Sequence, residues 1–209
     1  MKFFINIIGM MVILPAAVWA RPVSYPGGIT LMQMNDFDTS SIHMHYSPTA
    51  NYSLGYKGEY WRNDDWHFQG VQINYLIKRW NKPASQANVY LKSGTGWAFD
   101  KDNKNNLAAF TGVSLDWEDR RFFTSYSNRF LEAGQITQFF TQNARVGIAP
   151  YMGDYGDLHT WLMLQIDHQP EKENALTTTF LARFFKGEYL VELGVTQDGD
   201  ALMNFIIRY

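Results

Sequence analysis

Charged side chains occupy alternate positions in the most regular stretches of this 209-residue chain. In the segment 188–196, Glu192 stands between the apolar residues Val191 and Leu193. Because a β-strand has a period of two residues, such alternation gives a strand one charged and one apolar face. Charged faces that meet inside a barrel could line a polar passage or form a closed network of ion pairs. The candidate lumen-lining residues are Lys57, Glu59, Lys92, Asp116, Arg129, Arg145, Asp167, Arg183, Glu192 and Arg208.

A second group of residues could bind a metal ion. Met32 and Met34 belong to one expected strand, and His43 and His45 belong to the next. A tight turn between these strands would place Met34 opposite His43 and Met32 opposite His45, with all four side chains on one face. Thioether and imidazole ligands together suit copper ions. The alternative is that the methionines only fill space, as methionine often does.

Serine and histidine residues could in principle support hydrolysis, but their spacing matches no catalytic motif. The candidates are Ser114, Ser125, His67, His159 and His168. No Ser-His pair falls on clearly facing positions of neighbouring expected strands, and the sequence has no G-x-S-x-G motif. The sequence therefore leans against an enzyme and implies no cofactor.

Strands must position all these residues. Alternating apolar residues run through most of the chain and are separated by turn-forming segments such as Asn63-Asp64-Asp65 and Asp198-Gly199. The pattern predicts an all-β fold, an antiparallel up-and-down transmembrane barrel of about twelve strands, or about ten if a doubtful hairpin near 131–140 is merged. The expected strands are 29–37, 41–47, 52–62, 66–77, 87–99, 107–117, 121–130, 141–151, 158–168, 176–185, 188–196 and 201–209.

Residues 1–20 are expected to be a secretory signal peptide. Lys2 supplies a positive start, Phe3–Ala17 is an almost unbroken apolar run, and small residues follow it. We expect cleavage between Ala20 and Arg21, which would leave residues 21–209 as a single barrel domain. An uncleaved N-terminal anchor is the alternative, and the shortness of the apolar run disfavours it.

Composition narrows the possible partners. A formal net charge of −2 argues against nucleic acid as a partner. The absence of cysteine excludes disulfides and a lipid anchor on a cysteine. No stretch after the expected signal peptide approaches the roughly 20 apolar residues that a membrane helix needs. If the chain spans a membrane, it must do so with strands.

Alternation alone does not decide whether the apolar faces fill a soluble core or point outward into lipid. Aromatic residues make up 16% of the chain, and small residues crowd the charged faces of the expected strands. Both features favour a membrane barrel, with aromatic girdles at the strand ends and a narrow charged lumen. The expected girdle residues are Tyr52, Tyr60, Trp66, Trp80, Trp97, Trp117, Tyr189 and Tyr209.

The last expected strand, 201–209, carries the most specific signal. Met203, Phe205, Ile207 and Tyr209 share one face, and the sequence ends on this aromatic residue. The pattern resembles the assembly signal of bacterial outer-membrane β-barrel proteins as a class. The resemblance implies an outer-membrane location in a Gram-negative-type cell, with membrane lipids and the barrel-assembly machinery as partners.

The sequence predicts the function less sharply than the fold. Passage or binding of a small polar solute in the charged lumen is the leading hypothesis. Three alternatives stay open: an outer-membrane lipid-modifying enzyme, a purely structural barrel, and a soluble periplasmic binding barrel.

Overall fold

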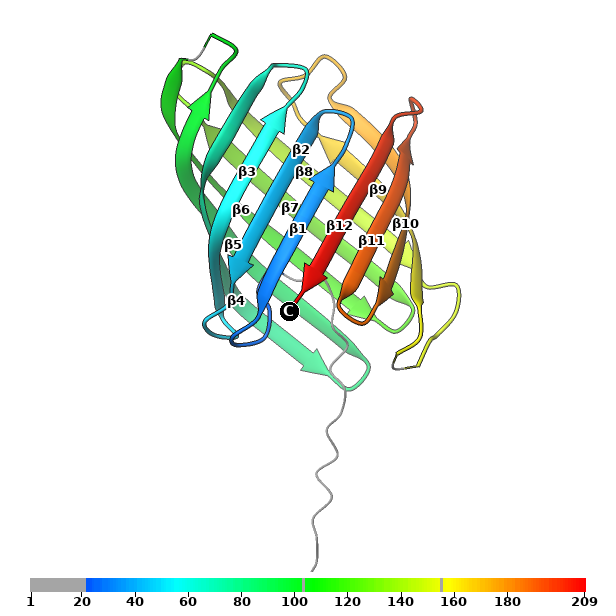
Figure 1. Cartoon of the computed structure of the whole chain (residues 1–209). Coiled ribbons are helices and arrows are strands. Elements are labelled where there is room, and N and C mark those ends of the chain that lie inside the picture. The colour runs from blue at the N-terminus through cyan, green and yellow to red at the C-terminus, as the bar shows by residue number, and fades with distance from the viewer. Residues whose placement is uncertain (1–21, 103, 155) are drawn as a thin grey trace, which may run out of the picture.

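The chain forms a closed barrel of twelve β-strands within residues 22–102, 104–154 and 156–209, which a computed structural model describes (Figure 1). The expected signal peptide lies outside the described residues. Each strand pairs antiparallel with its neighbours in sequence, and β1 pairs with β12 to close the barrel. This topology confirms an up-and-down barrel with twelve strands and not ten. The strands are β1 (Ile29–Asn35), β2 (Thr39–Tyr46), β3 (Tyr52–Trp61), β4 (Trp66–Lys82), β5 (Ser85–Phe99), β6 (Asn105–Asp119), β7 (Phe122–Glu132), β8 (Gln138–Ile148), β9 (His159–His168), β10 (Leu176–Lys186), β11 (Tyr189–Thr196) and β12 (Ala201–Arg208).

The strands β4 and β5 are longer than the expected 66–77 and 87–99, because β4 continues to Lys82 and β5 begins at Ser85. The register between them shifts from Leu76 to Lys78. An extra residue at such a bulge reverses which side chains point inward. Arg79 therefore donates hydrogen bonds to Asn88 and Tyr90. Counting alternate residues cannot predict this change, because the bulge depends on pairing with another strand.

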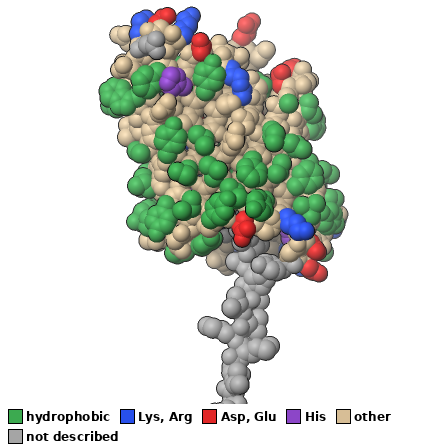
Figure 2. Space-filling view, in the orientation of Figure 1, with side chains coloured by type: hydrophobic (Ala, Val, Ile, Leu, Met, Phe, Trp, Pro, Cys, Tyr) green, Lys and Arg blue, Asp and Glu red, His purple; other side chains and the backbone are tan. Residues whose placement is uncertain are grey.

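The apolar faces of the strands point outward, as in a transmembrane barrel. On β11, Leu193 is 47% exposed, whereas the adjacent Glu192 is 2% exposed. Figure 2 shows hydrophobic side chains over the wall of the barrel and most charged side chains at its two ends. A soluble barrel would have the opposite arrangement. No helix within the described residues is long and apolar enough to cross a membrane.

The two ends of the barrel differ in what covers them. We call the end that carries Tyr209 the terminal end, and the end that carries the turn between β1 and β2 the far end (Figure 1). The turns after β3, β5, β7, β9 and β11 also lie at the far end, because the strands alternate in direction.

An apolar cluster fills part of the lumen near the far end. We call it the aromatic cluster, although alanines and a leucine complete it. Trp61 and Trp66 stack with ring centroids 5.5 Å apart, and Phe68 meets Phe110 edge to face at 5.7 Å. Trp66 is 2% exposed, so its expected place in an outer girdle was wrong. The cluster consists of Trp61, Trp66, Phe68, Ala98, Ala108, Phe110, Leu131, Ala133 and Phe139.

Candidate functional site in the barrel lumen

The rest of the lumen contains a polar cavity of about 310 Å³. Its lining includes Asp36, beside the far-end turn, and Pro22, Glu118 and Phe123 near the terminal end. Residues from both ends of the barrel therefore border one continuous cavity. Of the ten predicted lumen-lining residues, five border it: Lys92, Asp116, Arg145, Asp167 and Arg183.

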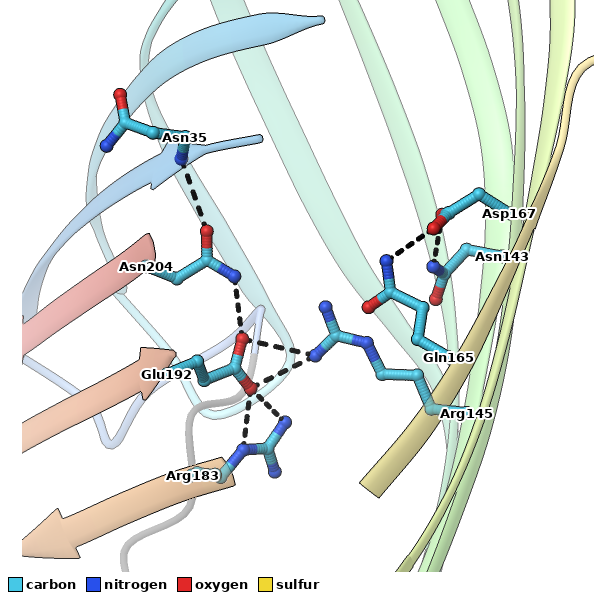
Figure 3. A network of polar contacts seen from close by, with 8 residues as sticks. All are labelled: Asn35, Asn143, Arg145, Gln165, Asp167, Arg183, Glu192 and Asn204. Carbon is cyan, nitrogen blue, oxygen red and sulfur yellow. Dashed lines mark hydrogen bonds and ion pairs between the residues drawn. The ribbon is translucent and has the colours of Figure 1, made fainter. Parts of the chain in front are cut away.

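Glu192 is the centre of a hydrogen-bonded network beside this cavity (Figure 3). Arg145 Nη1 donates to both Glu192 oxygens at 3.0 and 3.3 Å, and Arg183 Nε donates to Oε1 at 2.7 Å. Asn204 Nδ2 donates to Oε2 at 2.7 Å. Because these donors come from β8, β10 and β12, one buried carboxylate joins three strands. We call these four residues the Glu192 network.

The Glu192 network is also supported from its edges. The Asn204 side-chain oxygen accepts a hydrogen bond from the backbone nitrogen of Asn35 at 3.2 Å. The Arg183 guanidinium lies over the ring of Phe123, 4.9 Å from its centroid. Such contacts hold the charged groups in place, so that they form a fixed field along the cavity wall.

Two further carboxylates lie on the cavity wall and accept hydrogen bonds from amides. Asp167 accepts from Asn143 and Gln165, each at 2.6 Å, and Asp116 accepts from Asn88 at 2.6 Å. Neutral amides orient these carboxylates without cancelling their charge. The cavity therefore has both fixed anions and fixed cations on its wall.

Lys57, Glu59 and Arg129 form a separate ion-paired group next to the aromatic cluster. Glu59 Oε1 lies 2.6 Å from Arg129 Nη1 and 3.0 Å from Lys57 Nζ. The Arg129 guanidinium also lies 5.3 to 6.0 Å from the ring centroids of Trp61, Phe110 and Phe139. None of these three charged side chains is among the cavity-lining residues. The remaining predicted residue, Arg208, is buried on β12 opposite Thr30.

A segment that precedes β1 folds into the terminal end of the lumen. Val23 is 2% exposed and packs with Leu76 and Tyr90. The carbonyl oxygen of Pro22 accepts hydrogen bonds from Ser53 Oγ at 2.7 Å and Asn74 Nδ2 at 3.2 Å. This segment narrows the terminal end of the barrel.

The loop between β9 and β10 reaches across part of the far end. Lys172 Nζ forms an ion pair with Asp38, and it lies 5.8 Å from the centroid of Trp61. Glu171 Oε1 accepts a hydrogen bond from the Phe140 backbone nitrogen at 2.9 Å. Since Asp38 lies in the turn between β1 and β2 and Phe140 lies on β8, the loop is anchored on two sides.

Asp36 is the titratable group at the far end of the cavity. Its carboxylate accepts hydrogen bonds from the backbone nitrogens of Asp38 and Thr39, at 2.9 and 2.6 Å. Burial outweighs these bonds and raises the pKa of Asp36 above its ordinary value.

The four predicted metal ligands all occur on β1 and β2, but their expected register was wrong. Met32 pairs with His43, Met34 with Ser41, and Thr30 with His45. The turn is centred one residue earlier in the chain than expected, which shifts the register by two residues, and Asp36 closes it by accepting hydrogen bonds from Thr39. Among the described residues, no group of three or more histidine or acidic side chains could hold a metal ion.

The serine and histidine residues considered for catalysis do not meet. Ser114 and Ser125 border the cavity. His67 stacks on Phe99, and His168 Nδ1 lies 3.1 Å from Gln142 Nε2. No hydrogen bond among the described residues joins a serine to a histidine in this group.

Sequence reasoning missed the amides and the interior aromatic residues. Gln165 and Asn204 are polar residues in phase with the charged positions, so alternation could have identified them. The aromatic cluster was harder to foresee, because Trp61 and Phe68 occupy the inward phase of their strands with apolar side chains. An apolar residue in the inward phase was the available signal.

Neither a family model nor a curated protein matches this chain. Solved structures do match its fold. The "KdgM porin in complex with disordered oligogalacturonate" matches with a TM-score of 0.52 and 8% identity, covering 87% of this chain and 98% of that one. "KdgM porin" matches with a TM-score of 0.49 and 9% identity, covering 87% and 98%. "LpxR from Salmonella typhimurium" matches with a TM-score of 0.48 and 9% identity, covering 87% and 99%. The chain is thus similar in fold to a solved porin barrel.

Proposed function

We propose that this protein is an outer-membrane barrel whose lumen passes or binds a small polar solute. The observation that carries this proposal is the cavity bordered by residues from both ends of the barrel and lined with fixed charges. We also propose that a signal peptide is removed after Ala20, and that the barrel-assembly machinery inserts the protein.

The size of the cavity limits the solute. A volume of about 310 Å³ corresponds to about ten water molecules, at about 30 Å³ of liquid volume for each. It is at the small end of the range of about 300–1,000 Å³ for ligand pockets. Solutes of a few non-hydrogen atoms would fit, whereas long or bulky molecules would meet the segment at Pro22 or the loop at Lys172.

The arrangement of charge supports a polar solute. Arg145 and Arg183 lie on one part of the cavity wall, and Asp116 and Asp167 add carboxylates held by amides. An uncharged apolar solute would have to displace water from these groups without replacing its hydrogen bonds. A solute with hydroxyl or charged groups would replace them.

Conductance across a planar bilayer tests this function. We expect the purified wild-type protein to show a small, steady conductance. Arg145→Ala should shift the ion selectivity towards cations, because it removes a fixed positive charge from the cavity wall. The adjacent Val146→Ala alters a lipid-facing side chain that is 55% exposed, so it should leave selectivity unchanged.

The absence of any conductance in the wild type would contradict the proposal that a solute passes through the lumen. It would favour a closed, structural barrel. Conductance with equal selectivity in both variants would show that ions do not pass Arg145. Membrane fractionation separately tests the location, since recovery as a soluble periplasmic protein would contradict the whole proposal.

A further inference from the structure

Four buried polar atoms without a hydrogen-bond partner gather on the inner faces of β1 and β2. They are Thr30 Oγ1, His43 Nε2 and both ring nitrogens of His45. The three residues are 0%, 6% and 1% exposed. Buried polar groups are almost always hydrogen-bonded, so several unpartnered atoms in one place indicate a site for a polar ligand.

The geometry of the two strands brings these atoms together. His43 and His45 are two residues apart on β2, so both rings point into the lumen. Their ring centroids are 4.6 Å apart. Thr30 lies directly opposite His45 on β1. On the other side, the partner of His45 on β3 is Gly55, which packs directly against the His45 backbone, since a Cβ there would lie 2.4 Å from His45 Cα.

Positive charge surrounds this group of residues. Lys57 and Lys92 both act electrostatically on His43, where Glu59 opposes them, and Lys92 and Arg208 act on His45. Lys57 is paired with Glu59 at 3.0 Å. Among the described residues, no hydrogen bond or ion pair engages the ammonium group of Lys92, which borders the cavity.

The surrounding charge decides between an anion and a metal ion. A cation at the imidazoles would be repelled by the lysines and by Arg208, in an interior where charges interact strongly. The register also leaves only Met32 beside the histidine pair, because Met34 faces Ser41. An oxyanion would be attracted by Lys92, and it could accept hydrogen bonds from the imidazole N–H groups and the Thr30 hydroxyl.

We propose that His43, His45, Thr30 and Lys92 form a binding site for the carboxylate or phosphate group of a small anion. This inference rests on the proposed function and narrows its solute class, because Lys92 and Met32, the partner of His43 on β1, border the cavity. The solute would place its oxyanion between Lys92 and the two imidazoles.

Nuclear magnetic resonance of the purified barrel with isotope-labelled histidines tests this site. We expect saturable shifts of the His43 and His45 imidazole signals on addition of sodium acetate, inorganic phosphate or both. The signals of His67 and His159 should not follow the same curve. The two anions separate carboxylate binding from phosphate binding.

Lys92→Met is the decisive variant, because methionine matches the lysine stem in length and removes its positive charge from the cavity wall. We expect at least tenfold weaker anion binding. Lys78→Met, which removes an exposed lysine from β4, is the matched control and should bind as the wild type does.

Two results would overturn the proposal. One is the absence of saturable shifts with either anion, and the other is anion binding that Lys92→Met does not weaken. Saturable shifts with silver ions but with neither anion would assign the pair to a soft metal instead. Anion binding without bilayer conductance would contradict passage through the barrel and leave the anion site standing.

Discussion

Two regions of the same lumen solve the problem of filling a barrel in different ways. On one side, the aromatic cluster packs large apolar side chains against each other, with Arg129 over three of their rings. On the other side, the Glu192 network places charged side chains around a cavity. Both regions lie behind the same kind of lipid-facing wall.

The difference shows what each region can do. Close-packed aromatic rings exclude water, so their contribution is to stability, and a missing ring leaves a hole. Charged groups beside a cavity set the field that a solute meets, and three donors hold Glu192, so the loss of one donor removes only part of its support. We infer that the aromatic cluster makes the barrel rigid, whereas the charged residues beside the cavity select the solute.

The largest effect expected from this comparison is the loss of an aromatic ring from the cluster. Phe110→Ala removes a 5% exposed side chain and its edge-to-face contact with Phe68. It should lower the free energy of unfolding by about 3–5 kcal/mol. Denaturant unfolding of the protein in lipid vesicles measures this loss, and ion selectivity should not change.

Phe130→Ala is the matched control for this change. Phe130 lies on β7 and is 39% exposed on the lipid-facing side. Its truncation leaves no interior hole, so it should lower the free energy of unfolding by clearly less than Phe110→Ala does. Equal losses for the two variants would show that the aromatic cluster does not stabilise the barrel as a packed core.

A smaller effect separates the two groups of arginines. Arg129→Ala leaves Glu59 with Lys57 as its one ion-pair partner, and it also removes the contacts with three rings. We expect a loss of about 3 kcal/mol, at the lower end for breaking a buried pair. Arg145→Ala leaves Glu192 with Arg183 and Asn204. We expect about 1.5 kcal/mol there, the lower end for a hydrogen bond to a charged group.

The unfolding free energies of the two variants are measured under identical conditions. A loss for Arg145→Ala equal to or larger than that for Arg129→Ala would contradict the comparison, because Arg183 and Asn204 would then fail to support Glu192 without Arg145. Arg129→Lys keeps the positive charge but changes the shape of the charged group. Its free energy of unfolding should therefore lie between those of the wild type and Arg129→Ala.

The sequence was sufficient to predict the barrel, because alternation is a local property of each strand. Glu192 between Val191 and Leu193 already defines two faces, and the same holds on the other regular strands. The strand count followed from turn-forming residues such as Asp198 and Gly199. These features depend on neighbours in the chain, which a sequence displays directly.

The site was predictable only in part, because it depends on which strands meet across the lumen. Alternation places Glu59 and Arg129 on inward faces, but their pairing joins residues from β3 and β7. The register of Met32 with His43 depends on a turn geometry that Asp36 and Thr39 set. Likewise, the inward direction of Arg79 depends on a bulge.

The smallest expected effect concerns pH and the cavity end at Asp36. Burial is the largest influence on this carboxyl and raises its pKa. A carboxyl whose pKa is higher in the folded state stabilises that state at low pH, and its contribution is lost as the pH rises through the folded pKa. The unfolded value is about 3.9, so the window begins there and extends upward. Wild-type unfolding free energies measured over this window should therefore fall relative to those of Asp36→Asn as the pH rises.

The exposed turn residue Asp64 provides the control for this pH series, because Asp64→Asn removes a carboxyl of the same kind from the next far-end turn. The Asp64→Asn series is the reference for the Asp36→Asn series. If the two series run parallel over the window, water reaches Asp36 as freely as the outer turns. The polar side of the lumen would then be open to solvent at its far end, and the loop at Lys172 would not shield it. If the stability difference between the wild type and Asp36→Asn grows with pH instead, the Asp36 carboxyl is shielded from water. It would then resemble the aromatic cluster in this respect, although it lies at the end of the polar cavity.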